Sequence, residues 1–356
     1  MKSLYLLFTI PIVFLDCSSN QNVVIPDVNL ATAVREALEL GPTVPIPQNQ
    51  LVELEQLNAG GKGIKDLTGL EKASGLKVLK LYKNEITDLR PIAGLTQLTE
   101  LILYDNKISD ISPIAGLKNL KTQLYLDGNQ ISDISPLANL TQLSELNICQ
   151  NQISDISPLA HLTQLTMLHL YDNQISDLEP LKTLTQLEKL NLGKNQISEF
   201  SPLSNLKQLT SLYLHNNYIK DLTALVGLPN LRSLSLAHNQ ISNITPLAEL
   251  RQLTHLTLQN NQISDITPLA TLSMLNGLLL GENQISDVKP CSKLTQITEL
   301  YLSKNHIRDI TPLENLTELI DLWIIGNPIQ DMEPLRKLLK QNKDLEIDVE
   351  TLSDKH

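Results

Sequence analysis

One nine-residue phrase recurs through most of the chain and constrains its fold more than any other feature. NQISDISPL stands at residues 129–137 and again at 151–159. Variants of the phrase begin at residues 173, 195, 239, 261 and 283. A fixed period of roughly 20–50 residues is typical of one continuous array of stacked units. We therefore expect a single repeat array closed by two distinct ends, and not two independent domains.

An asparagine marks each repeat. Successive asparagines lie 22 residues apart, except for one spacing of 23 between Asn106 and Asn129. An earlier, imperfect copy has Lys62 at this position. Because the chain must bend sharply after the strand, we expect the side-chain amide to pair backbone groups that would otherwise be buried without partners. This structural ladder comprises Asn84, Asn106, Asn129, Asn151, Asn173, Asn195, Asn217, Asn239, Asn261, Asn283, Asn305 and Asn327.

The pattern around the asparagine resembles a known repeat. Each unit reads L-x-x-L-x-L-x-x-N-x-I-x-D-I-x-P-L-x-x-L, as in LTELILYDNKISDISPIAGL at 98–117. This resembles the leucine-rich repeat, in the 22-residue subclass of the internalins and of the phosphatase-regulating cytosolic proteins. The sequence NQISDISPLANLTQL is most similar to the internalins. The resemblance covers residues 54–331 and implies an α/β solenoid with a curved parallel sheet on its concave face and short 3₁₀ turns on its convex face.

The residues themselves support the same coil. Leu101 and Leu103 are two residues apart, so both side chains point to the inner face of a short strand, whereas Ile102 points outward. A single unit cannot bury its own apolar face, so stacking must create a continuous core. Because the chain is 42% hydrophobic but only 3% aromatic, this core must consist of leucine and isoleucine.

A proline begins the return leg of each unit. It stands seven residues after the asparagine in every repeat except the one that has Ala224. Serine or threonine often precedes it, as in Ser112-Pro113 and Thr267-Pro268. Such a residue as N-cap, followed by proline, predicts a helix start. Since few residues remain before the next strand, we expect a 3₁₀ turn.

An aspartate column invites comparison with a metal site. It includes Asp88, Asp110, Asp133, Asp155 and Asp177. One carboxylate from each successive turn forms a row and not the cage of roughly six to eight oxygens that calcium requires. We therefore predict that these carboxylates accept hydrogen bonds from nearby turn amides, and that the protein has no metal site and no cofactor.

The two ends differ from the repeats. Residues 20–53 form a predicted N-terminal cap, with a helix within 25–40 and a second short helix after Pro47. Residues 332–356 form a predicted C-terminal cap, with a helix in EPLRKLLKQN and a last strand or tail in LEIDVE. Both caps would cover the apolar ends of the array.

Residues 1–19 indicate export. Lys2 is followed by an apolar run that ends at Leu15 and is shorter than the about 20 residues that span a bilayer. This is the pattern of a secretory signal; the alternative is the hydrophobic start of a cytosolic cap. Cys17 stands where the lipid-bearing cysteine of a bacterial lipoprotein would fall, although Asp16 replaces the small residue expected before it. We predict an extracytoplasmic protein, either secreted or tethered through lipid at Cys17.

Charge and cysteine content exclude several classes of function. A net charge of -11 argues against nucleic-acid binding and against adhesion to anionic lipid. Cys149 and Cys291 lie about six repeats apart, or about 30 Å at strand spacing, so they cannot form a disulfide within one molecule. We expect a monomer that is stable without disulfides.

The candidate binding surface lies where the repeats differ. In the family that the chain resembles, outward strand positions line the concave face and commonly bind partners. Six of the eight tyrosines and the only tryptophan stand four or two residues before a repeat asparagine. Such side chains are enriched at binding hot spots, and the alternative is their strand propensity. The candidates are Tyr82, Tyr104, Tyr125, His169, Tyr171, Tyr213, His215, Tyr301 and Trp323.

Catalysis is a weaker hypothesis. His169, His215 and His255 should face the concave side but lie roughly 10 Å from one another, too far to share a zinc ion. Cys149 and His169 fall on adjacent strands, but no third group is placed to orient the histidine and an open sheet excludes no water. No glycine-rich phosphate loop is present. We therefore predict no catalytic residues.

Two functional hypotheses follow. The first is an exported, internalin-like module that grips a protein ligand, in preference to a glycan, along the concave face. The alternative is a cytosolic regulatory scaffold of the phosphatase-regulating type. The 23-residue unit adds one residue in LKTQLYL, just before Tyr125. This residue either bulges the strand entry and re-aims its neighbours or is a tolerated surface insertion.

Overall fold

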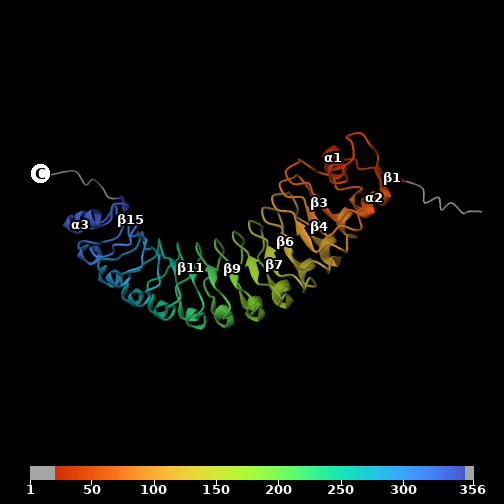
Figure 1. Cartoon of the computed structure of the whole chain (residues 1–356). Coiled ribbons are helices and arrows are strands. Elements are labelled where there is room, and N and C mark those ends of the chain that lie inside the picture. The colour runs from red at the N-terminus through yellow and green to blue at the C-terminus, as the bar shows by residue number, and fades with distance from the viewer. Residues whose placement is uncertain (1–20, 349–356) are drawn as a thin grey trace, which may run out of the picture.

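The computed structural model describes residues 21–348. The predicted signal segment, Cys17 and the end of the predicted C-terminal cap lie outside the described residues. The chain forms an open arc whose inner side is lined by short strands and whose outer side carries small coiled turns (Figure 1). The expected solenoid with a concave parallel sheet is confirmed. Among residues 21–348, no helix has both the length and the apolar character needed to cross a membrane.

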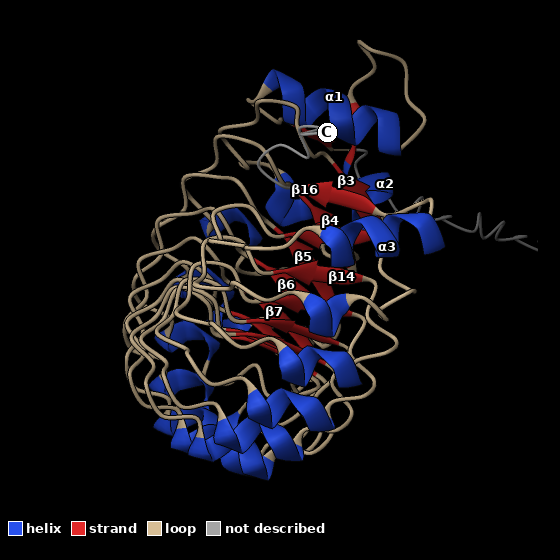
Figure 2. Ribbon diagram, turned by 90° about the vertical axis from the view of Figure 1, so that its left-hand side faces the viewer, coloured by secondary structure: helices blue, strands red, loops and turns tan. Residues whose placement is uncertain are grey.

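Within residues 21–348, fourteen strands form the concave sheet, and their spatial order follows the sequence from β3 to β16. Neighbouring strands are parallel and pair residue for residue, so corresponding positions of successive repeats lie side by side. Figure 2 shows these strands stacked as rungs along one side of the coil. The strands are β3 (Gln56–Asn58), β4 (Val78–Lys80), β5 (Glu100–Ile102), β6 (Gln123–Tyr125), β7 (Glu145–Asn147), β8 (Met167–His169), β9 (Lys189–Asn191), β10 (Ser211–Tyr213), β11 (Ser233–Ser235), β12 (His255–Thr257), β13 (Gly277–Leu279), β14 (Glu299–Tyr301), β15 (Asp321–Trp323) and β16 (Glu346–Asp348).

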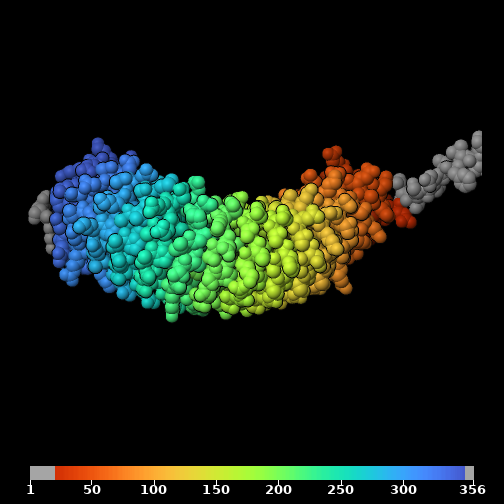
Figure 3. All heavy atoms as spheres, turned by 90° about the horizontal axis from the view of Figure 1, so that it is seen from below, coloured from red at the N-terminus to blue at the C-terminus, as the bar shows by residue number. Residues whose placement is uncertain are grey.

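Short 3₁₀ turns line the convex face, as predicted. Viewed from this side, the surface runs in sequence order from one end to the other, since each repeat contacts its neighbours in the sequence (Figure 3). The turns are η1 (Leu70–Lys72), η2 (Arg90–Ile92), η3 (Ser112–Gly116), η4 (Ser135–Leu137), η5 (Ser157–His161), η6 (Glu179–Thr183), η7 (Ser201–Asn205), η8 (Thr223–Gly227), η9 (Thr245–Glu249), η10 (Thr267–Thr271), η11 (Lys289–Lys293) and η12 (Thr311–Leu313).

The prediction that serine or threonine caps these turns is wrong. In η3 the N-cap is Ile111, which makes no side-chain capping bond, and Ser112 is already the first residue of the turn. The backbone N–H of Ser112 instead donates to Oδ1 of Asp110 at 2.8 Å. A carboxylate two residues upstream reaches this amide, so the aspartate column performs the capping that was assigned to serine and threonine. The expected bonds between aspartates and turn amides are present.

The core is one continuous cluster of leucine and isoleucine side chains. Leu101 and Leu103 are fully buried, as the alternation predicts. Ile102, on the opposite face of β5, is also only 5% exposed, and the sheet register places Lys80 and Tyr125 on either side of it. The cluster runs from Ile25 in the N-terminal cap to Leu345 near β16 without interruption.

The N-terminal cap contains the two expected helices, α1 (Val28–Ala37) and α2 (Gln48–Val52). It also contains an antiparallel pair that we did not predict, β1 (Asn22–Val23) with β2 (Ile46–Pro47). Asp27 joins this cap to the array. Its Oδ1 accepts from the first turn of α1, and its Oδ2 accepts from the N–H groups of Lys65 and Asp66.

The C-terminal cap contains helix α3 (Glu333–Gln341) and strand β16. Strand β16 pairs in parallel with β15 and so continues the concave sheet beyond the last repeat. The motif LEIDVE therefore contributes a strand, which was one of the two predicted outcomes.

The extra residue of the 23-residue unit lies at the entry to β6. The N–H groups of Lys121 and Thr122 both donate to the carbonyl of Thr99 at 3.2 Å. In the next repeat, Ser144 and Glu145 donate to two different carbonyls, those of Lys121 and Thr122. A regular unit uses one carbonyl for both bonds, so the insertion forms a bulge.

Candidate functional site

The nine sequence-predicted binding residues form two rows on the concave face. Tyr125, His169, Tyr213, Tyr301 and Trp323 are each the last residue of their strand. The other four, Tyr82, Tyr104, Tyr171 and His215, each stand two residues beyond a strand end. Since side chains alternate between the faces of a strand, both rows point away from the core. All nine are partly exposed, with Trp323 the most open at 44%.

Three aromatic pairs organise these rows. The rings of Tyr82 and Tyr104 stack with centroids 4.8 Å apart and planes 10° from parallel. Tyr301 and Trp323 stack similarly at 4.9 Å and 22°. The in-register sheet places the two residues of each pair on adjacent repeats, so the stacking follows from the spacing between neighbouring strands.

The third pair spans two repeats. The rings of Tyr171 and His215 lie 5.6 Å apart although Gly193 stands between them in the same row. A Cβ atom at Gly193 would lie only 2.4 Å from a ring carbon of His215, so the ring covers the glycine. Tyr82 covers Gly60 in the same way, with a corresponding distance of 2.3 Å. Sequence reasoning missed these glycines, although their place in the aromatic row is visible in the repeat alignment.

The hydroxyl of Tyr125 is fixed by an acidic neighbour. It donates to Oε2 of Glu145 at 2.8 Å. Burial, followed by this bond, raises the pKa of Tyr125 to about 12. Beside it, burial raises the pKa of Asp127 to about 6, and Oδ1 of Asp127 has no hydrogen-bond partner among the described residues. Lys80 and Glu100 form an ion pair at 2.8 Å on the same face.

The suspected pair of Cys149 and His169 does not have the properties of a nucleophilic site. Burial raises the pKa of the Cys149 thiol to about 12 and lowers the pKa of His169. Both shifts oppose the thiolate–imidazolium state that such chemistry uses. Cys149 and Cys291 are free thiols. Within residues 21–348, no group of three or more His, Cys, Asp or Glu side chains is placed to hold a metal ion.

The twelve asparagines of the ladder share one hydrogen-bond pattern. In the example of Asn84, Nδ2 donates to the carbonyls of Leu81 and Ala59 at 2.9 Å. Oδ1 of Asn84 accepts from the N–H of Ile64 in the preceding unit at 3.0 Å. The residue before each asparagine has a left-handed backbone, with φ between 52° at Gln150 and 75° at Gly326. This turn directs the chain away from the strand, and only two of its twelve residues are glycine.

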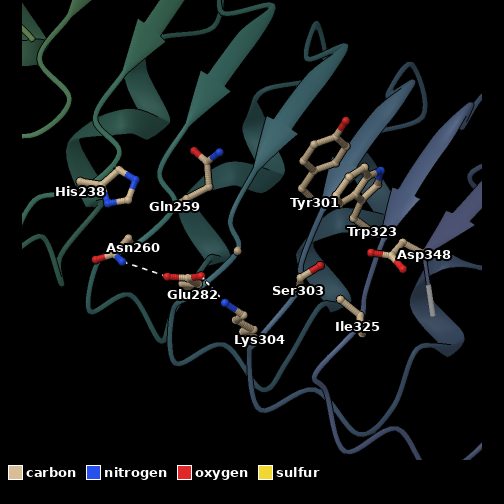
Figure 4. Close-up of a pocket in the computed structure, with 11 residues that line it drawn as sticks. His238, Gln259, Asn260, Glu282, Tyr301, Ser303, Lys304, Trp323, Ile325 and Asp348 are labelled. Carbon is tan, nitrogen blue, oxygen red and sulfur yellow. Dashed lines mark hydrogen bonds and ion pairs between the residues drawn. The ribbon is translucent and has the colours of Figure 1, made fainter. Parts of the chain in front are cut away.

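A hollow of about 360 Å³ opens at the C-terminal end of the two rows. Tyr301 and Trp323 form one wall, and Gln259, Ser303 and Asp348 also line it (Figure 4). The strands that contribute these residues are β12, β14, β15 and β16 or the segments that follow them. The hollow adjoins the stacked aromatic pair and combines apolar and polar groups.

A family model described as leucine-rich repeats (two copies) matches most of the array. The matched stretches are 74–119, 96–139, 122–161, 141–183, 163–205, 185–227, 229–271, 273–315 and 295–337. Their periodic overlap follows the repeat that the asparagines define. A comparison with curated proteins finds no match.

Several solved structures resemble most of the chain. An internalin from Listeria monocytogenes is 35% identical, with a TM-score of 0.89, over 95% of this chain and 100% of the internalin chain. A leucine-rich repeat protein from Leptospira interrogans is 26% identical, with a TM-score of 0.75, over 85% of each chain. The plant peptide hormone receptor RGFR1, solved in complex with RGF2, is 25% identical with a TM-score of 0.67; the match covers 79% of this chain and 49% of the receptor chain.

Proposed function

The chain belongs to the leucine-rich repeat family and is internalin-like, and from this premise we propose that it is an exported, monomeric, non-catalytic module that grips a protein along its concave face. Leucine-rich repeat proteins are protein-binding modules, and the plant receptor among the similar structures was solved with RGF2 bound. The observation that carries the proposal is the confinement of six tyrosines and the single tryptophan to the two concave rows.

The form of these rows suits protein recognition. Paired aromatic rings present large, rigid surfaces whose polar edges can hydrogen-bond, and they lose little conformational entropy on binding. The stacked pairs at the two ends and the tilted pair in the middle are spread along the whole arc. A partner that follows the concave face would contact all three pairs, and a partner of this size is more readily a protein than a single glycan.

Alanine substitution tests the location of the binding surface. Affinity capture with the purified chain first supplies a partner protein, and titration then measures its affinity for variants. We expect Tyr104→Ala to weaken binding by about 2 kcal/mol, or about 30-fold, with little change in melting temperature. Tyr218→Ala is the matched control, since Tyr218 is 54% exposed but lies outside both rows. Unchanged affinity for Tyr104→Ala together with weaker affinity for Tyr218→Ala would refute binding on the concave face.

Export is tested separately. The support for it is the sequence of residues 1–19, with Lys2 and the apolar run to Leu15. Mass spectrometry of the protein from its native cells should find a processed N-terminus. An intact residue 1 on a protein in the cytosolic fraction would favour the regulatory-scaffold alternative. If lipid is attached at Cys17, Cys17→Ala should release the protein from membranes.

A further inference from the structure

The end of the aromatic rows next to β16 is chemically unlike the rest of the concave face. Tyr301 and Trp323 stack there, and β16 places Asp348 directly beside Trp323 in the sheet register. At the first position of strands β14 and β15, the sheet register places Glu299 beside Asp321 in the same way. Figure 4 shows Tyr301, Trp323 and Asp348 in succession along the wall of the hollow.

Among the described residues, these carboxylates have no counter-charge. Glu299, Asp321 and Asp348 form no ion pair within the described part of the chain. Among the residues that line the hollow, the single lysine or arginine is Lys304, and its Nζ already pairs with Oε1 of Glu282 at 2.6 Å. The region around the aromatic pair is therefore negatively charged at neutral pH.

Two polar atoms of residues that line the hollow also lack a hydrogen-bond partner in the described part of the chain. Oε1 of Gln259 and Oγ of Ser303 are buried, and neither forms a hydrogen bond among the described residues. Buried polar groups usually find partners, so both side chains would gain a hydrogen bond by turning toward a donor that enters the hollow. Gly281 lies between them in the row and adds no side chain to the hollow.

We propose that this hollow binds an arginine side chain of the partner protein; the inference rests on the proposed function and specifies one contact of it. A guanidinium carries five N–H donors and no acceptor, which matches a site of carboxylate, amide and hydroxyl oxygens. Its planar, weakly hydrated face stacks on tyrosine and tryptophan rings. A neutral sugar could stack on the same rings but would leave the carboxylates without a counter-charge, so charge complementarity favours arginine.

Trp323 provides a direct reporter, because it is the only tryptophan in the chain. The probe is a short glycine-spaced peptide with two arginines and blocked termini, titrated to millimolar concentration against the full chain while tryptophan fluorescence is recorded. The control peptide has citrulline in place of arginine, which keeps the shape and removes the charge. We expect a saturable change with the arginine peptide, at least about tenfold weaker binding of the citrulline peptide, and loss of affinity as salt increases.

Variants locate the site. Asp321→Asn should weaken binding of the arginine peptide several-fold, whereas Glu249→Gln on the convex turn η9 should leave its binding unchanged. Gly281→Leu should abolish the fluorescence change by filling the hollow. A Cβ atom at Gly281 would meet nothing closer than 3.4 Å, so the backbone should accept the leucine. If Gly281→Leu does not fold, Asp321→Asn still tests the site independently.

Several outcomes would overturn the arginine site. Equal binding of the arginine and citrulline peptides would do so, as would no saturable signal, an unaffected Asp321→Asn variant, or a neutral oligosaccharide that competes at this tryptophan. The proposed function would survive any of these results, because it is tested with Tyr104→Ala and Tyr218→Ala against the captured partner.

Discussion

The side-chain amide of Asn195 donates a hydrogen bond at 3.0 Å to the backbone carbonyl of Leu170, which lies 25 residues earlier in the preceding repeat. The same nitrogen donates to the carbonyl of Leu192 at 3.1 Å, and Oδ1 accepts from the N–H of Ile175 at 3.0 Å. One side chain therefore links its own repeat, at Leu192, to two backbone positions of the preceding repeat, one before and one after that repeat's asparagine. Asn195 is only 7% exposed, so water cannot readily replace these bonds.

Asn195→Ala should lower the free energy of unfolding by about 1–3 kcal/mol, because it leaves buried backbone groups unpaired. Urea denaturation followed by circular dichroism measures the change. Asn205→Ala is the matched control, since Asn205 is exposed at the end of η7 and its side chain makes no hydrogen bond with the described residues. Its effect should stay within about 0.5 kcal/mol. Equal effects of the two substitutions would show that the ladder does not stabilise the stack.

The aspartate column should make stability depend on pH. The N–H of Ser157 donates to Oδ1 of Asp155 at 2.8 Å, and this bond is the main cause that lowers the pKa of Asp155. The backbone N–H of Ser112 lowers the pKa of Asp110 in the same way. The pKa values of Asp265 and Asp309 are lowered first by a hydrogen bond with the side chain of the threonine two residues later and then by the backbone N–H of that threonine. A carboxyl group with a lowered pKa in the folded state stabilises the protein fully above its unfolded pKa, about 3.9. That contribution is lost as the pH falls through the folded value.

We therefore expect the urea midpoint to change little from pH 7 to pH 5 and to fall below about pH 4. The difference between wild type and Asp155→Ala should shrink over the same acid range. Asn243 provides an internal control, because its Oδ1 accepts from the N–H of Thr245 at 3.0 Å but does not titrate. The effect of Asn243→Ala should stay constant with pH; a parallel decrease would attribute the acid sensitivity to other groups.

The sequence predicted those parts of the fold that a single residue type controls in every repeat. Inward leucines, the asparagine turn and the 3₁₀ return leg are each set by local spacing, and the structure has all three. The capping role was misassigned because Ser112 and Asp110 both fit a helix-start pattern, and which side chain reaches the amide depends on the folded geometry of the turn.

The candidate surface was predictable in position but not in arrangement. Alternation along each strand places Tyr171 and His215 on the concave face. That their rings meet over Gly193 depends on side-chain rotamers two repeats apart, which no local pattern encodes. The hollow beside Trp323 likewise depends on β16, since this strand brings Asp348 to a position that the repeat itself does not contain.

Gly227 should tolerate alanine poorly, although Gly116 stands at the same position of another repeat. A Cβ atom at Gly227 would lie 2.1 Å from the carbonyl oxygen of Ser204, whereas one at Gly116 would meet nothing within 4 Å. The unit of Gly227 is the one in which Ala224 replaces proline. Because the clash is with backbone, Gly227→Ala should cost about 1–3 kcal/mol in urea denaturation. Gly116→Ala should be neutral or stabilising by up to about 1 kcal/mol. Equal stability of the two variants would contradict this close approach.

Gly193→Ala should change the ionisation of His215 without a large loss of stability. Burial lowers the pKa of His215, with a smaller effect from the charge of His238. An alanine Cβ would come within 2.4–2.8 Å of ring atoms of His215, and a ring at the end of a side chain can move aside. The ring would then leave Tyr171 and become more hydrated, so its pKa should rise toward the ordinary value of about 6.5.

NMR titration of the histidine ring protons measures this shift, with Gly116→Ala as the control that should leave every histidine pKa unchanged. An unaltered His215 in Gly193→Ala would mean that the ring does not lie over the glycine. The substitution keeps both Tyr171 and His215 in the chain but separates their rings. It therefore also tests whether the arrangement of the two rings contributes to partner binding. If a partner spans the whole arc, Gly193→Ala should weaken its binding, because a displaced His215 would occupy the space that the partner needs.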